Sequence, residues 1–504
     1  MRSLLALVLC LAGQLLAAGP VHLHVEAPAF PNEEVTLYTY LDAFTRRLEP
    51  LAKGRTDSAG HVHLKAEVEG THHALLLVGQ AGAELWLRPG TYHASLGAPA
   101  PGQVLTLAGT ARLPFTFIDL DPLDVNALVS DLNQRLDAFL AEDLATDQAG
   151  AMEAVAKARS GATILERDTS GAARGLFLSP NWEQSRVDSF AEKLRKFYAG
   201  VEDPWFRQDV EYGLAGLHLG PRTNDRELFN RFLKGKPVLY DVPEYTRFFS
   251  NFYGDFILGA PFRNHAAQLI RLVREARTDS LKTLLASNDL LADARINELV
   301  LIINLYTNHA NALFDAGGIR RVLADVRDRS TFPEHRLIAA NMLWDLTAMA
   351  PGSTLPEVDL LGADGHALVT DSLLRGTTCL LVTTLNNPYC EQEMLAMAQL
   401  GEEYRGHAKL LYVVLGRTPD ELARWLGGKP QPGTWAVPAD RQELLDSWRI
   451  KHVPTFFLLD GRTLSGPAGM KPSSGLGAQL HRLRTERERE GRIRPDGLGP
   501  PPKR

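Results

Sequence analysis

Apolar and polar side chains alternate along the first part of the chain that follows an N-terminal apolar run. Residues 21–26 read Val-His-Leu-His-Val-Glu, and residues 35–40 continue with valine, leucine and tyrosines. A period of two predicts strands with one buried face. Turn sequences at residues 57–60 and 88–90 separate these runs. We therefore expect residues 20–112 to form a β-sandwich-like domain.

The spacing of apolar residues then becomes helical, from about residue 115 to residue 350. Leu128, Leu132 and Leu136 recur every four residues, which places them on one face of a helix. Proline-containing breaks divide the region into several such segments. We expect an all-α domain over residues 115–350, and its sequence shows no motif for a particular chemistry.

A dense aromatic stretch from residue 245 to residue 256 leaves two interpretations open. It could line a ligand-binding cleft, or it could be the buried stripe of a helix. Aromatic residues at helical spacing usually belong to a core, so we favour the second interpretation.

After Gly352 short apolar runs alternate with helical patterns, which indicates an α/β domain over residues 352–485. The run at residues 379–384 is apolar and rich in β-branched residues, as in a buried central strand. Residues 486–504 begin with alternating Glu and Arg and end in Gly, Pro and Lys. This composition predicts a disordered tail.

The N-terminus has the layout of a secretory signal peptide. One positive charge at Arg2 precedes a mostly apolar run over residues 4–16, and the small residues Ala17 and Ala18 follow. Cleavage after Ala18 is expected, which gives a signal peptide over residues 1–18. A buried N-terminal helix is the alternative. The run is shorter than a membrane span, so we expect a periplasmic or otherwise extracytoplasmic protein with no membrane span after cleavage.

The amino-acid composition indicates only the broad class of protein. The chain has 504 residues, a net charge of −6, 45% hydrophobic and 23% charged residues, as in an ordinary protein of several globular domains. This charge does not favour a nucleic-acid partner. Of its three cysteines, Cys10 lies in the signal segment, which leaves Cys379 and Cys390. Two cysteines do not make a disulfide scaffold.

Histidines gather in the first hundred residues, and two His-x-His pairs could present imidazoles to a metal. The seven are His22, His24, His61, His63, His72, His73 and His93. The residues inside the pairs, Leu23 and Val62, are apolar, so the histidines should stand on the solvent face of their strands. We therefore expect no metal site, and the sequence indicates no cofactor.

Three spaced segments in the C-terminal third carry a resemblance to a known family. They read Cys-Glu-Gln-Glu-Met at residues 390–394, Ile-Lys-His-Val-Pro-Thr at 450–455 and Leu-Asp-Gly at 459–461. Together they resemble the thioredoxin-like superfamily, in particular the TlpA/ResA-like (AhpC/TSA-type) envelope thiol–disulfide oxidoreductases. The resemblance covers residues 352–485 and implies a thioredoxin-like fold for this α/β domain, with a cis bond between Val453 and Pro454.

The chain departs from that family at one position. The nucleophilic cysteine of the family would fall at Asn387, so the motif reads Asn-Pro-Tyr-Cys and is degenerate. Disulfide exchange needs an attacking thiolate and a second, resolving thiol. Asparagine supplies neither, but it is a preferred helix N-cap, and Pro388 suits the first helical position.

Cys390 remains as a possible lone thiol whose pKa the helix N-terminus could lower. The alternative is an inert, partly buried remnant, because the second cysteine of this fold is the less exposed one. Cys379 lies at the start of the preceding strand, too far away for the roughly 7 Å that a disulfide allows. We expect it to be a small core residue, and both thiols to be free.

Three interpretations of function follow. In the first, the chain is a non-catalytic binding protein of the cell envelope, and Pro388, Tyr389, Val453, Pro454 and Thr455 form a docking surface for an extracytoplasmic protein or polypeptide.

The second interpretation is a TlpA-like or single-cysteine thiol–disulfide oxidoreductase that acts through Cys390. The third treats the thioredoxin-like domain as an accessory and places the function in the helical domain.

Overall fold

The computed structural model describes residues 18–79, 81–99, 111–159, 184–219, 224–427, 431–450, 452–466 and 470–493. Contacts divide the chain into two compact units, one of residues 1–98 and 113–342 and one of residues 99–112 and 343–504. We call them unit 1, which holds the first strands and most of the helices, and unit 2, which holds the C-terminal sheet. The expected signal peptide lies outside the described residues except for Ala18.

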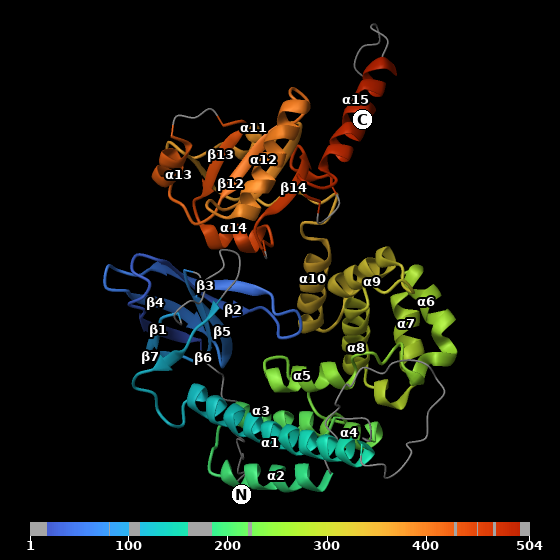
Figure 1. Cartoon of the computed structure of the whole chain (residues 1–504). Helices are drawn as coiled ribbons and strands as arrows, with labels where there is room; N and C mark the ends of the chain where they lie inside the picture. Colours follow the sequence, from blue (N-terminus) through green and yellow to red (C-terminus); the bar gives the residue numbers. More distant parts are fainter. Residues whose placement is uncertain are drawn as a thin grey trace, which may run out of the picture. The chain divides into compact units, whose positions relative to one another are not determined.

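The N-terminal strands of unit 1 form two sheets (Figure 1). In the first, the order is β4 (His61–Val68), β1 (Gly19–Glu26), β7 (Gly90–Leu96) and β9 (Phe115–Phe117). The second contains, in order, β3 (Leu48–Arg55), β2 (Glu34–Tyr40), β5 (His72–Val78) and β6 (Ala81–Leu87). The two-residue strand β8 (Ala111–Arg112) belongs to unit 2 by its contacts. Val21, Leu23 and Val25 are buried, which confirms the alternation. The strands extend beyond residue 112, because β9 pairs with β7.

The middle of the chain is helical, as its spacing predicts. Its helices are α1 (Val125–Arg159), α2 (Gln184–Phe197), α3 (Pro204–Leu217), α4 (Asp225–Phe232), α5 (Pro243–Phe252), α6 (Ala266–Arg274), α7 (Thr278–Leu285), α8 (Ala294–Thr307), α9 (Ala316–Arg329) and α10 (Pro333–Thr347), with two 3₁₀ turns at Ala260–His265 and Asp289–Leu291. Polar N-caps begin several of them. Asp203, Asn224 and Asp293 each accept hydrogen bonds from backbone N–H groups of the first helical turn.

The aromatic stretch is core, as we expected. Tyr245, Phe248, Phe249 and Tyr253 are each exposed by 1% or less. The first three lie on α5, whose first turn contains Pro243 and whose N-cap is Val242. The apolar face of this helix is therefore fully used in packing, and its other face is available for other contacts.

Unit 2 is an α/β domain around one mixed sheet (Figure 1). Its strands follow the order β10 (Leu360–Gly362), β13 (Thr434–Pro438), β12 (Lys409–Val414), β11 (Thr377–Thr383), β14 (Thr455–Asp460) and β15 (Thr463–Leu464). Its helices are α11 (Thr370–Leu373), α12 (Pro388–Glu403), α13 (Pro419–Leu426), α14 (Arg441–Ser447) and α15 (Leu476–Ile493).

Strand β11 lies at the centre of this sheet, as its apolar sequence predicts. All seven of its residues are buried. It runs parallel to β12 and antiparallel to β14. Its consecutive residues Leu380 and Leu381, which point to opposite faces of the sheet, belong to two different apolar clusters. The sheet is therefore covered on both faces, as in an α/β layer structure.

The C-terminal helix corrects one boundary of the sequence interpretation. Helix α15 extends to Ile493, so residues 486–493 are helical and not part of a tail. The Glu and Arg residues of this stretch have high helix propensity. Residues 494–504 lie outside the described residues. Among the described residues no helix is long and apolar enough to cross a membrane.

Candidate functional site

Asn387 occupies the N-cap of α12. Its side-chain Oδ1 accepts hydrogen bonds from the backbone N–H groups of Tyr389, at 3.0 Å, and Cys390, at 3.2 Å. Pro388 follows in the first turn, where a missing N–H is harmless. Asn386 precedes them with a φ of +61°, a conformation that asparagine tolerates better than most residues. The expected local role of Asn387 is confirmed.

The two described cysteines are free and buried. Cys390 has 0% exposure at the start of α12, and Cys379 has 0% exposure within β11. Burial raises the pKa of the Cys379 thiol to about 12. The expectation of two free thiols, with Cys379 in the core, is confirmed. Cys390 has no surface through which a reagent could reach it unless the start of the helix opens.

The peptide bond between Val453 and Pro454 is cis, as the resemblance implies. Strand β14 places it near the motif at residues 387–390, because Thr455 lies opposite Val382 near the end of β11. The chain turns from there towards Asn387. Pro454 is buried, and Val453 and Thr455 are half-buried.

A second set of residues at this site was missed by the sequence analysis. Glu393 is exposed by 1%, and its carboxylate accepts hydrogen bonds from the backbone N–H of Ser473, at 2.9 Å, and from its Oγ, at 2.5 Å. Lys471 donates from Nζ to the Tyr389 hydroxyl at 2.6 Å. The segment before α15 is therefore tied to the first turns of α12.

One sequence signal could have identified Glu393. It lies three residues after Cys390, hence on the same face of the helix, and a face that buries a cysteine can also bury its neighbour. The partners themselves lie about 80 positions away in the sequence, where no local pattern connects them to α12. Among the described residues, the motif thus consists of a capped helix start and a polar contact that ties it to the segment before α15, and neither described thiol is exposed.

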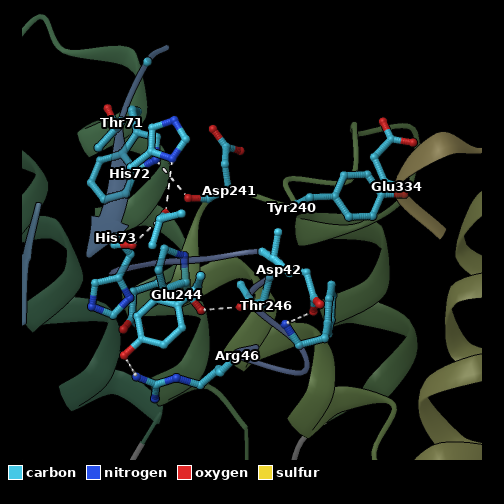
Figure 2. A pocket seen from close by; sticks show the side chains of 18 of the residues that line it. Asp42, Arg46, Thr71, His72, His73, Tyr240, Asp241, Glu244, Thr246 and Glu334 are labelled. Carbon is cyan, nitrogen blue, oxygen red and sulfur yellow. Dashed lines mark hydrogen bonds between the residues drawn. The ribbon is translucent and has the colours of Figure 1, made fainter. Parts of the chain in front are cut away.

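Unit 1 contains a cleft of about 1190 Å³, which the sequence analysis also missed (Figure 2). Its walls come from the turn after β2, the turn before β5, the N-terminal turns of α3 and α5, and α10. The polar face of α5 contributes Glu244, Arg247 and Ser250. The aromatic stretch itself is thus core, while the opposite face of the same helix lines a cleft.

The histidines of the first sheet face away from its buried side. His24 of β1 lies opposite His63 of β4 and His93 of β7, and the rings of His24 and His63 stack at 4.1 Å. Partial burial, and then the charges of these neighbours, lower the pKa of His24. Within the described ranges, no group of three or more His, Cys, Asp or Glu side chains is arranged to hold a metal ion.

No family model matches the chain, and no curated protein matches it. Several solved structures are similar to it. A Bacteroides vulgatus protein named as a thiol–disulfide oxidoreductase is 24% identical, with 27% of this chain and 99% of that chain covered and a TM-score of 0.25. A thiol:disulfide interchange protein from Bacteroides sp. is 11% identical, with 28% and 91% covered and a TM-score of 0.25. A thioredoxin-like protein from Bacteroides caccae is 11% identical, with 61% and 99% covered and a TM-score of 0.28.

Proposed function

We propose that this chain is an exported protein with a thioredoxin-like domain that binds a polypeptide or a partner protein and does not exchange disulfides. The observation that carries the proposal is the hydrogen bonding of Asn387. Its side chain caps α12 through two backbone N–H groups, at the position where the resembled family has its nucleophile. The amide thus has a structural role and no redox role.

Thiol chemistry at this motif lacks its reacting groups. Exchange requires one thiolate to attack and a second thiol to resolve the mixed disulfide. Cys390 is fully buried, and the other described cysteine, Cys379, lies inside the sheet opposite Leu458 of β14. This burial argues against the alternative of a single-cysteine oxidoreductase that acts through Cys390.

A docking surface beside the motif supports the binding role. Pro388 and Tyr389 are exposed next to the buried thiol. Among the described residues, β15 pairs only with Leu459 and Asp460 of β14, so the first half of β14 forms the outer edge of the sheet. An extended peptide can add to such an edge through main-chain hydrogen bonds. Val453, Pro454 and Thr455 lie where that peptide would begin to pair.

Insulin reduction with dithiothreitol tests the absence of exchange. The wild-type protein should show no turnover above the dithiothreitol background. The Asn387→Cys variant restores two thiols and should gain activity, whereas Asn387→Ser, which keeps a capping oxygen without a thiol, should stay inactive. Wild-type turnover comparable to that of a two-cysteine enzyme, and lost in Cys390→Ser, would contradict the proposal.

Binding is tested separately with an unfolded polypeptide whose cysteines are blocked. We expect saturable binding by titration calorimetry, weakened by Tyr389→Ala and unchanged by the control variant Tyr306→Ala. Tyr306 lies on α8 of unit 1, away from the motif in the sequence.

A further inference from the structure

The cleft of unit 1 is large enough to hold a ligand. Its volume of about 1190 Å³ exceeds the roughly 300–1,000 Å³ of small-molecule sites. Such a volume suits a short stretch of polypeptide better than a metabolite. The cleft lies entirely within unit 1 and shares no residue with the altered motif of unit 2.

Hydrogen bonds join two of the walls of the cleft. Asp42, in the turn after β2, accepts hydrogen bonds from the backbone N–H groups of Phe44, at 2.9 Å, and Thr45, at 2.7 Å. Its other oxygen accepts one from Asn341 Nδ2 of α10 at 2.7 Å. The turn is thereby held to the helix. A ligand would meet a wall that is already ordered, which lowers the entropic cost of binding.

The third wall is tied to the sheet in the same way. Arg88 donates from Nε to Thr71 Oγ1 at 2.7 Å and forms an ion pair with Asp203, the N-cap of α3. Trp205 donates from its indole N–H to the backbone carbonyl of Asp241 at 3.1 Å. The segment that carries Asp241 is therefore positioned by the start of α3.

The cleft is lined by more carboxylate side chains than arginine side chains. Three arginines line it, and each is paired within the protein: Arg46 with Glu84, Arg88 with Asp203, and Arg247 with Glu244. Glu69 and Asp241 also line the cleft. In the described part of the chain, the side chains of these two residues form no ion pair, and both residues are exposed. They are the acidic groups left to meet a ligand.

Aromatic rings lie on both sides of the Asp241 carboxylate in the view of Figure 2. Figure 2 shows the Asp241 carboxylate between His72 and Tyr240, with Glu334 beyond Tyr240. The wall already binds guanidinium groups of the protein in this manner. Arg46 lies 4.8 Å from the centroid of the Tyr40 ring, and Arg295 lies 5.9 Å from that of Tyr240. A tyrosine face beside a carboxylate attracts a cation.

We propose that this cleft binds a polypeptide segment that carries arginine or lysine, with the basic side chains received by Asp241 and Glu69. The volume indicates the polypeptide, and the two carboxylates without an ion pair, Glu69 and Asp241, indicate its charge. The inference goes beyond the binding function proposed above, because the cleft shares no residue with the docking surface proposed in unit 2. It stands even if the motif at residues 387–390 proves to be redox-active.

Titration of the full-length protein with a blocked, alanine-rich peptide that contains two arginines tests this inference. The control peptide carries citrulline at both positions, which keeps the shape and removes the charge. We expect saturable binding of the arginine peptide that weakens as the ionic strength rises, and no measurable binding of the citrulline peptide. Equal binding of the two peptides, or binding of free argininamide without the arginine peptide, would overturn the inference.

Variants then assign the site. Glu69→Gln combined with Asp241→Asn should weaken binding at least about tenfold, since two charge-assisted contacts are lost. Glu192→Gln combined with Glu275→Gln removes the same charge from exposed positions of α2 and of the end of α6, and it should leave the affinity unchanged. The same loss in both double variants would refute the assignment. The Asn387→Cys variant should bind the peptide with the affinity of the wild type. Equal affinity would show that the cleft binds the peptide independently of the motif at residues 387–390.

Discussion

The side-chain oxygen of Asn387 and the backbone N–H of Cys390 are hydrogen-bonded at 3.2 Å. The residue at the altered position thus stabilises the turn of helix that carries the remaining cysteine. A cysteine in its place would have a poorer acceptor for the same N–H groups. An amide at this position therefore stabilises the start of the helix better than a thiol would.

Removal of the cap should loosen the first turn of α12. In Asn387→Ala the N–H groups of Tyr389 and Cys390 lose their acceptor, at a cost of about 1 kcal/mol. Amide hydrogen exchange at these two positions should then be about fivefold faster. Asn387→Asp keeps the acceptor and should exchange like the wild type. Equal protection in the alanine variant would show that the cap does not limit opening here.

Both described thiols should be unreactive in the folded protein. Cys379 and Cys390 are each exposed by 0%, and the pKa of Cys379 is raised to about 12 by burial. We expect alkylation by iodoacetamide to be slow for both at neutral pH, and complete for both once the chain is denatured. Peptide mass spectrometry distinguishes the two sites. Fast native labelling of Cys390 alone would instead favour the single-cysteine oxidoreductase.

Local sequence was sufficient for the features that depend on neighbouring residues. The N-cap at Asn387, the buried strand around Cys379 and the alternation at Val21 and Leu23 each follow from a few adjacent side chains. The resemblance supplied the cis bond before Pro454, which no local pattern requires.

Features that join distant segments could not be predicted in this way. The contact of Glu393 with Ser473 joins residues that are 80 positions apart in the sequence. The cleft is built from separate turns and helices, which carry Asp42, Arg88 and Asp241. Their proximity is set by how strands and helices pack. The polar face of α5 was a signal for the cleft, but on its own a polar helix face indicates only solvent.

The hydroxyl of Ser473 should contribute measurably to stability. It donates to the buried carboxylate of Glu393 at 2.5 Å, and a hydrogen bond to a charged group contributes about 1.5–3 kcal/mol. Ser473→Ala should lower the free energy of unfolding of unit 2 by that amount in urea. Ser474→Ala is the matched control, because its hydrogen bond to Lys471 uses the backbone N–H. Similar losses in the two variants would argue against a specific role for the Ser473 hydroxyl.

Asp209 of α3 is a buried acid that the proposed functions do not use. It is exposed by 3%, and burial, followed by the nearby charge of Glu244, raises its pKa to about 8. The backbone N–H of Glu244 donates a hydrogen bond to this carboxyl group. One of its oxygens, Oδ1, has no hydrogen-bond partner in the described structure. The carboxyl group therefore stays protonated at neutral pH in the folded protein.

This shift should make the stability of unit 1 depend on pH in a defined direction. The unfolded chain releases the Asp209 proton near pH 4, and the folded chain releases it only near pH 8. The stabilisation is therefore fully present below about pH 4 and declines by about 1.4 kcal/mol per pH unit until about pH 8.

The variant Asp209→Asn tests this dependence, because its side chain cannot ionise and keeps an oxygen acceptor for the Glu244 N–H. The other titrating groups cancel when variant and wild type are compared at the same pH. In urea unfolding, the stability of the variant relative to the wild type should thus be greater at pH 7 than at pH 5. A difference that does not change with pH would mean that Asp209 is already ionised in the folded protein.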